Sequence, residues 1–346
     1  MLILFSLRIK PQINNATTIG YKDTYGYRLI YCLLLTGSNA GKSLSASELE
    51  QWQPNDGLLW VHLRYSHPDA QQWIINAQLP QTETDTLLAE HTRPRTLSSP
   101  DGILMALRGI NLNPNSAPED MVSMRIYAQQ HRIISTCERQ LQSVKDIAEQ
   151  IINHPNSINS SANFLVSLCE RLTERKMELI HNLEDELDTL DDQITLPSAA
   201  TLRVDIAELR KQTVTLRRYF SPQRDALSRL LNDSHFLFDN EHKLRIREIN
   251  ETLIRVIEDL DAVRDRASVT QEQLQSQQSE QLNKRLYFLS LISAVFLPLG
   301  FLTGLLGVNI GGIPGTDIPW AFSAFCAGLI VLIALQMWLF YRLKWL

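Results

Sequence analysis

The sequence predicts a cytoplasmic α/β domain, followed by long stalk helices and by two transmembrane helices. Three observations support this fold class. Short apolar strands alternate with short helices in residues 27–158, a helical period follows in residues 159–285, and two long uncharged runs lie in residues 286–346. The whole chain is 44% hydrophobic and 21% charged, with a formal net charge of −5, so the membrane signal is confined to its last part.

The first domain is expected over residues 27–158, after an N-terminal extension, residues 1–26, whose structure stays open. The apolar start of that extension lacks the preceding positive charge and the small-residue cleavage pattern of a signal peptide. Short apolar segments predict strands at 27–35, 57–63, 102–110, 121–128 and 131–136. Helices are expected at 45–52, 68–79 and 138–153. The first helix carries Ser47 and Glu50 at the spacing of a capping box.

The stalk region begins with a helix from about Ser160. Leucines at helical spacing define its apolar face, and the helix is expected to end at Leu196-Pro197, because proline cannot continue the hydrogen-bond ladder. Six carboxylates between Glu184 and Asp192 form a face that we interpret as solvated, with attraction of cations toward a pore as the alternative. A second helix is expected from Thr201, with an interruption at Ser221-Pro222.

A third, very long helix is expected to begin near Glu241. Neither proline nor glycine occurs from there to Pro298, so one helix can enter the membrane without a break and reach Asn309, a length of about 100 Å. A heptad seam runs along it, and its members are Ile249, Leu253, Val256, Leu260, Val263 and Ala267. Such a seam requires a neighbouring helix, and we infer that the stalk bundles with copies of itself.

Residues 286–308 and 318–341 are both long enough to cross a bilayer, which takes roughly 20 apolar residues. Lys284 and Arg285 precede the first run, Arg342 follows the second, and the connecting segment carries only Asp317. Because positive charge stays on the cytoplasmic side, both ends of the hairpin are expected to face the cytoplasm.

Two spans cannot enclose a water-filled path, but a symmetric ring of chains can. The first span is the better lining helix because it carries small or hydroxylated residues, and the second reads as the lipid-facing helix. At the outer end of the first span, Asn309 would form a ring of amide oxygens able to admit a hydrated divalent ion. The alternative is a plain turn residue, because asparagine and glycine are common in turns.

Other classes of function find little support. Four widely spaced cysteines argue against a disulfide framework, and an acidic chain without a basic cluster gives no footprint for nucleic acid. In residues 36–43, TGSNAGKS, only three residues separate Gly37 from Gly41, so a β-turn is favoured over a nucleotide-binding P-loop. No combination of nucleophile, base and orienting residue predicts an enzyme, and no cofactor is expected.

The C-terminal part of the chain resembles a known family. The stretch GVNIGGIPG (residues 307–315) follows an apolar helix with a Pro298-Leu299 step and precedes a second apolar helix. This pattern is similar to the CorA-type divalent metal-ion transporter superfamily, whose hallmark at this position is Gly-Met-Asn. Val308 replaces the methionine, and together with residues 107–136 this departure resembles the ZntB zinc-transporter branch.

The resemblance implies a homopentamer in the bacterial inner membrane, with a cytoplasmic funnel and a pore lined by the first span. It implies a filter of Gly307, Val308 and Asn309. It also implies lining residues Leu286, Leu289, Ser293, Leu297 and Gly300, the leucines forming apolar rings that close by dewetting. Zinc import coupled to protons and zinc efflux are both associated with this branch.

The residues alone do not identify the transported ion. Zn²⁺ favours histidine nitrogen and cysteine sulfur, and the first span has neither, so the ion would cross largely hydrated. Zn²⁺ is the expected substrate, with Co²⁺, Ni²⁺ and Cd²⁺ as further candidates. Any proton coupling must use pore water, Asp317 or cytoplasmic groups. The alternatives are a magnesium or cobalt transporter of the same superfamily and a membrane-tethered coiled-coil scaffold without transport.

Overall fold

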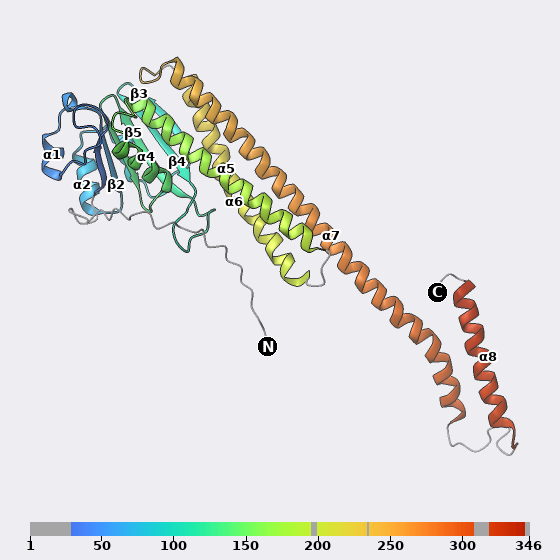
Figure 1. Ribbon diagram of the computed structural model, residues 1–346. Helices are drawn as coiled ribbons and strands as arrows, with labels where there is room; N and C mark the ends of the chain where they lie inside the picture. Colours follow the sequence, from blue (N-terminus) through green and yellow to red (C-terminus); the bar gives the residue numbers. More distant parts are fainter. Residues whose placement is uncertain (1–28, 195–198, 234, 308–317, 343–346) are drawn as a thin grey trace. The chain divides into compact units, whose positions relative to one another are not determined.

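The computed structural model (Figure 1) describes residues 29–194, 199–233, 235–307 and 318–342. These residues fall into two compact units, one that ends at Ser268 and one that begins at Val269. The strands are β1 (Leu29–Leu34), β2 (Leu59–Arg64), β3 (Arg95–Ser99), β4 (Gly102–Gly109), β5 (Val122–Gln129) and β6 (Arg132–Cys137). The helices are α1 (Ala46–Gln51), α2 (Pro68–Asn76), α3 (Gln81–Leu88), α4 (Gln142–Asn153), α5 (Ser161–Gln193), α6 (Ala199–Asn232), α7 (Asn240–Leu306) and α8 (Ala321–Arg342).

One sheet, in the order β1-β2-β6-β5-β4-β3, organises the first unit. Its neighbours are antiparallel except β2 and β6, which run parallel. The five predicted strands are confirmed, but β3 and α3 were not anticipated. Their sequences, RTLSS and QTETDTLL, are too polar to show an apolar run, and β3 is held at the sheet edge by its antiparallel pairing with β4.

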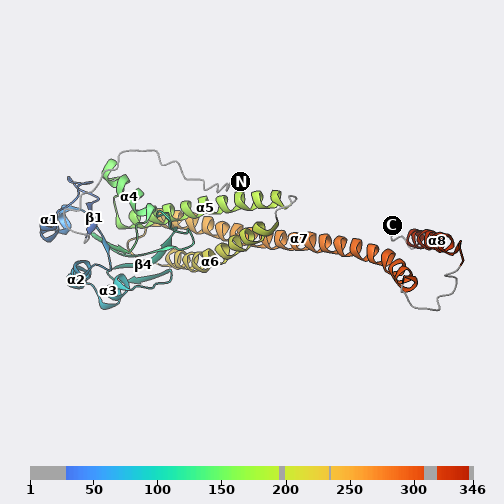
Figure 2. The ribbon, with the colours of Figure 1, turned by 90° about the horizontal axis from the view of Figure 1, so that it is seen from below.

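Both faces of the sheet are covered by helices, as Figure 2 shows for α2 and α3 on one side and α4 and α5 on the other. Strand β2 illustrates the alternation that two covered faces require. Val61 belongs to a buried apolar cluster with residues of α2 and α3. The preceding side chain, Trp60, points the opposite way and lies 4.9 Å from the Phe164 ring of α5, measured between ring centroids.

The predicted capping box of α1 was placed two residues too late. Ser45 is the N-cap: its hydroxyl accepts from the Glu48 amide at 3.3 Å, and Glu48 Oε2 accepts from the Ser45 amide at 2.8 Å. The spacing rule was therefore right but applied to Ser47 and Glu50, because the helix already begins at Ala46.

The TGSNAGKS stretch forms the turn that its spacing predicted. Gly37 and Gly41 have φ angles of +94° and +81°, values that side chains rarely adopt. The Ala40 amide donates a hydrogen bond to the Gly37 carbonyl at 3.3 Å, and the Gly41 amide donates one to the Leu34 carbonyl at 2.7 Å. The chain thereby folds back onto the end of β1.

The predicted interruption at Ser221-Pro222 was wrong, because α6 continues through Pro222 to Asn232. Proline removes one amide donor from a helix, but packing on both sides can hold the helix together. Phe220 before it and Gln223 after it are 0% and 1% exposed, and Gln223 Oε1 accepts from the Arg108 amide of β4 at 2.9 Å. Tertiary contacts thus offset the missing hydrogen bond.

The expected long helix is confirmed, since α7 runs unbroken from Asn240 to Leu306. Its heptad seam is covered within the single chain, and the inferred bundling of the stalk with copies of itself stays a prediction. All six members are 5% exposed or less within the single chain: Ile249, Leu253, Val256, Leu260, Val263 and Ala267. In the first unit, α5, α6 and the first part of α7 lie side by side (Figures 1 and 2), so intrachain packing covers the seam.

Ion pairs connect α7 with α5 at two levels of the bundle. Arg266 of α7 pairs with Asp188 at 2.6 Å and with Asp191 at 2.5 Å, both of α5. Nearer the other end of the bundle, Arg245 of α7 pairs with Glu170 of α5 at 2.8 Å. Asp188 belongs to the acidic run of α5, most of whose carboxylates are exposed as the solvated-face interpretation predicted.

Candidate ion pathway

The second unit contains the two helices expected to cross the membrane. The apolar part of α7 and the whole of α8 are long and apolar enough to do so, and the apolar stretch of each is not buried inside the chain. Large apolar side chains point outward on many sides of both, including Phe296, Phe301 and Phe322, which are 65–76% exposed. A helix that is apolar around its circumference and uncovered by protein is suited to lipid.

The predicted lining residues lie on one side of α7. Successive steps of 3, 4, 4 and 3 residues bring them together on a helix that turns about 100° per residue. All five are exposed in the single chain: Leu286, Leu289, Ser293, Leu297 and Gly300. A Cβ placed at Gly300 would meet nothing within 4 Å, so the face is open at this position as well.

Helix α8 covers the opposite side of α7. The half-buried residues of this part of α7 are Leu291, Ala294, Val295, Pro298, Leu299 and Leu302. On a helical projection of about 100° per residue, they centre roughly 170° from the five predicted lining residues. The hairpin therefore packs by one side of α7 and leaves the predicted lining side free.

A side chain of α8 compensates for the proline in α7. Pro298 cannot donate to the carbonyl of Ala294, four residues earlier, which a normal helical residue would do. Gln336 of α8 reaches across instead, and its Nε2 donates to that carbonyl at 3.5 Å. A role for Gln336 was not anticipated, because the second span was expected to face lipid. The sequence does contain a signal for this contact. A proline frees the carbonyl four residues before it, and Gln336 is an amide side chain within an otherwise apolar run that could donate to such a carbonyl.

Replacing Gln336 by leucine is expected to lower the free energy of unfolding by about 0.5–1 kcal/mol, because the Ala294 carbonyl loses its donor. The measurement is chemical unfolding of the protein in detergent micelles. Met337→Leu, at the exposed neighbouring position, is the matched control and should have no measurable effect. Equal effects of the two substitutions would mean that the Gln336 contact does not stabilise the hairpin.

Helix α7 ends immediately before the predicted filter. The amide of Gly307 donates to the carbonyl of Thr303 at 2.9 Å, which closes the last turn. A Cβ at Gly307 would lie 2.9 Å from that same carbonyl oxygen, so the position has no room for a side chain without a shift of the backbone. Val308, Asn309 and Asp317 lie outside the described residues.

Aromatic side chains mark the ends of the two spans. Tyr287 stands at the start of the apolar part of α7, and Trp320 immediately precedes α8. At the other end of α8, Trp338 and Tyr341 are exposed, and the Arg342 guanidinium lies 5.4 Å from the centroid of the Trp338 ring. These are the positions at which aromatic and basic residues anchor helices to a membrane interface.

No group of three or more histidine, cysteine, aspartate or glutamate residues arranged to hold a metal occurs among the described residues. His62 and Cys137 do meet, with Nε2 and Sγ 3.2 Å apart in the sheet. Burial lowers the pKa of His62 to about 3 and raises the pKa of Cys137 to about 12. Ser135 completes the cluster through its hydroxyl, 2.8 Å from His62 Nδ1, so we interpret it as a neutral, hydrogen-bonded part of the core.

Comparison with protein families now identifies the group to which the chain belongs. The family model described as "CorA-like Mg2+ transporter protein" matches residues 55–342, which is most of the chain and includes both apolar helices. The chain is a member of the CorA family. The matched residues contain strands β2 to β6 and helices α2 to α8.

Named relatives within the CorA family refine the comparison. The zinc transport protein ZntB of Yersinia enterocolitica is 38% identical over 83% of this chain and 88% of its own length. The structure of full-length CmaX is similar with a TM-score of 0.80 and 35% identity, covering 92% of this chain and 98% of CmaX. The complete CorA magnesium transporter of Methanocaldococcus jannaschii gives a TM-score of 0.77 at 17% identity, over 88% of this chain and 95% of that one, and shows a shared fold.

Proposed function

We propose that this chain transports zinc across the bacterial inner membrane, through a pore at the centre of a homopentamer. Two observations support zinc over the other metals of the family. A relative that is 38% identical over most of both chains is named a zinc transport protein. Val308 also stands in place of the methionine of the Gly-Met-Asn pattern.

The observation that carries the proposal is the side of α7 that α8 leaves uncovered. In a ring of chains, α8 would lie outward toward lipid and the open side of α7 would face the axis. That side carries Leu286, Leu289 and Leu297 at three levels, with Ser293 and Gly300 between and beyond them. A ring of leucines at each level can close the path by excluding water, and the small residues leave it wider between these levels.

The filter is proposed at Gly307, Val308 and Asn309. Gly307 ends the helix with its amide bonded to Thr303, and the two following residues would therefore come at the outer mouth of the pore. An amide oxygen from each chain would accept hydrogen bonds from the water shell of the ion, without the fixed charge that would hold a divalent cation too tightly. Asp317, in the same outer segment, would attract cations to the mouth.

Both ends of the hairpin are proposed to lie in the cytoplasm. Lys284 precedes the apolar part of α7 and Arg342 ends α8. Because positive charge is retained on the cytoplasmic side, these two ends of the hairpin share that side, and the α7–α8 connection lies outside. The sheet domain and the helical bundle would then be cytoplasmic.

Uptake of metal into proteoliposomes tests the proposal. Vesicles that contain the purified protein should take up Zn²⁺ faster than vesicles without protein. The uptake rates of Co²⁺, Ni²⁺, Cd²⁺ and Mg²⁺ should be measured at the same concentration for comparison. An inward or outward pH gradient separates proton-coupled transport from passive flux. A magnesium transporter would prefer Mg²⁺ over Zn²⁺, and a membrane-tethered scaffold would show no flux of any metal.

A further inference from the structure

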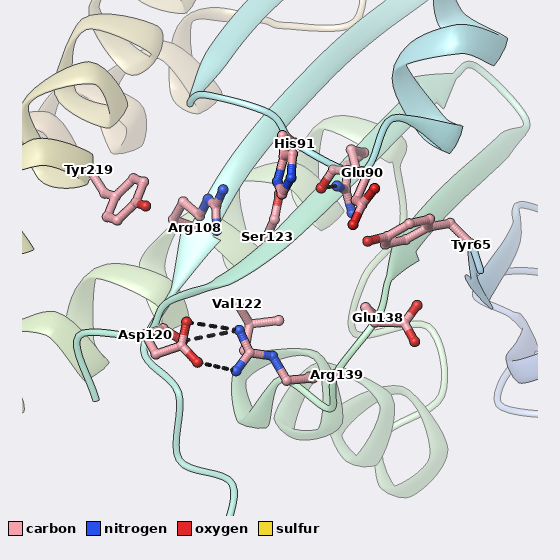
Figure 3. Close-up of a pocket in the computed structure, with 11 residues that line it drawn as sticks. Tyr65, Glu90, His91, Arg108, Asp120, Val122, Ser123, Glu138, Arg139 and Tyr219 are labelled. Carbon is pink, nitrogen blue, oxygen red and sulfur yellow. Dashed lines mark hydrogen bonds and ion pairs between the residues drawn. The ribbon is translucent and has the colours of Figure 1, made fainter. Parts of the chain in front are cut away.

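A cavity of about 320 Å³ lies in the first unit, where strands β4 and β5 meet α6. Its walls come from several loops as well as from these elements. The residues that line it are Tyr65, Glu90, His91, Arg108, Asp120, Val122, Ser123, Arg125, Glu138, Arg139 and Tyr219. Figure 3 shows the labelled side chains around one common space, with the Asp120–Arg139 ion pair at one side of it.

Two arginines in the wall have unmet hydrogen-bonding capacity. Arg125 is 0% exposed, and its Nη2 donates to the Glu90 carbonyl at 2.8 Å, while Nε and Nη1 have no hydrogen-bond partner in the described structure. Arg108 donates Nη1 to the Met121 carbonyl at 2.9 Å and Nη2 to the Thr92 carbonyl at 3.0 Å. Its Nε is likewise buried without a partner among the described residues.

Neither arginine forms an ion pair with a carboxylate in the described structure, although the side chains of Glu90, Asp120 and Glu138 also line the cavity and Asp120 acts on Arg108 through its charge. The ion pairs of the described residues include Arg139 with Asp120, but none with Arg108 or Arg125. Each guanidinium instead lies over a tyrosine ring, Arg125 over Tyr65 at 4.3 Å and Arg108 over Tyr219 at 4.7 Å from the centroid. The faces of these rings attract cations but do not neutralise them.

The two positive charges also act on each other. Burial lowers the pKa of Arg125 below its usual value; the Tyr65 side chain opposes this shift, and the charge of Arg108 adds to it. An arginine nevertheless remains protonated in proteins, so the cost of placing this charge in the interior is not relieved by loss of a proton. A negative group bound in the cavity beside the two guanidiniums would balance their charge.

We propose that this cavity binds a small oxyanion, either free phosphate or the phosphate group of a small metabolite. Arginine is the side chain best matched to phosphate and carboxylate oxygens. The ring of His91 adds a further donor at the wall, and the Ser123 hydroxyl, which lies 2.7 Å from Thr92 Oγ1, can donate when Thr92 donates to it. A volume of about 320 Å³ is of the size that holds a small organic ligand, and so leaves room for more than a bare ion.

A bound oxyanion would connect the sheet to the helical bundle. Arg125 and Ser123 belong to β5 and Arg108 to β4, whereas Tyr219 belongs to α6. The ligand would therefore favour the packing of α6 against the sheet. This role is separate from metal transport, and its test uses a binding measurement that does not depend on flux.

The test is calorimetric titration of the full-length protein in detergent with inorganic phosphate, and in a second arm with glycerol 3-phosphate, at ionic strength held constant with sodium chloride. Saturable binding is expected, and the tighter of the two ligands identifies free phosphate or a phosphate ester as the natural class. Arg125→Met should weaken binding at least tenfold. Arg132→Met, which removes a half-buried arginine whose guanidinium is already bonded to Gln129, should change affinity less than twofold.

Ser123→Asp keeps the test decisive if Arg125→Met does not fold. The new carboxylate would occupy the place of the anion beside the guanidiniums, so the variant should lose phosphate binding and unfold at a higher temperature than the wild type. Absence of saturable binding to the wild-type protein, or unchanged phosphate affinity in Ser123→Asp, would overturn the proposal.

Discussion

Asn309→Ala is expected to reduce zinc uptake into proteoliposomes at least tenfold while leaving the assembly intact. Loss of the amide would remove the acceptors that replace part of the water network around the ion at the pore mouth. The measurement is the initial rate of Zn²⁺ uptake per reconstituted chain. Size-exclusion chromatography in detergent should give the same elution volume for variant and wild type.

The matched control for this substitution is Asn283→Ala. Asn283 lies on α7 just before the apolar part, is exposed, and would sit on the cytoplasmic side. Its replacement should leave the rate of uptake unchanged. If Asn309→Ala transports zinc as fast as Asn283→Ala, the asparagine at position 309 is a turn residue and the filter lies elsewhere.

Lys176→Met is expected to stabilise the protein by about 3 kcal/mol at pH 7. Lys176 is 0% exposed in α5, and its Nζ donates to the Leu172 carbonyl at 3.0 Å and lies 5.7 Å from the Phe220 ring centroid. It has no carboxylate ion pair in the described part of the chain. Burial lowers the pKa of Lys176 from 10.5 to about 7, so folding carries the cost of burying or neutralising an amine.

The pH dependence of this effect has a defined sign. Between pH 7 and pH 10.5 the unfolded chain binds the proton and the folded chain does not, so the stability of the wild type should rise with pH across this range. Below pH 7 both states bind it, and the cost is present in full. Unfolding by guanidinium at several pH values should show the rise in the wild type and its loss in Lys176→Met. Lys211→Met, at an exposed position on α6, should behave as the wild type, and equal curves for all three proteins would contradict the account.

Much of the fold could be predicted because it depends on local patterns. The uninterrupted helix from Asn240 follows from the absence of proline and glycine, and five strands follow from their apolar runs. β3 and α3 escaped prediction because their sequences are polar and their place is set by neighbours. The interruption predicted at Pro222 was wrong because the packing of Phe220 and Gln223, on both sides of the proline, cannot be read from the local sequence.

In the candidate site, too, the features set by local sequence could be predicted and those set by distant contacts could not. The common side of the lining residues follows from helical spacing, since steps of three and four residues return to one face. The packing of α8 on the other side could not be predicted in this way. The bond from Gln336 to the carbonyl freed by Pro298 joins residues that are 42 positions apart in the sequence. The cavity arginines were overlooked for the same reason, because Arg108 and Arg125 come together only through the pairing of β4 with β5.

The most direct test of the central claim is whether Ser293 faces the ion path. In a background in which Cys326 is replaced by alanine, Ser293→Cys places one thiol on the open side of α7, and Val295→Cys places one at nearly the same depth on the side that α8 covers. The measurement is zinc uptake before and after a water-soluble, positively charged methanethiosulfonate reagent. The account predicts strong block of Ser293→Cys with little change in Val295→Cys, and equal block of both, or block of Val295→Cys alone, would contradict it.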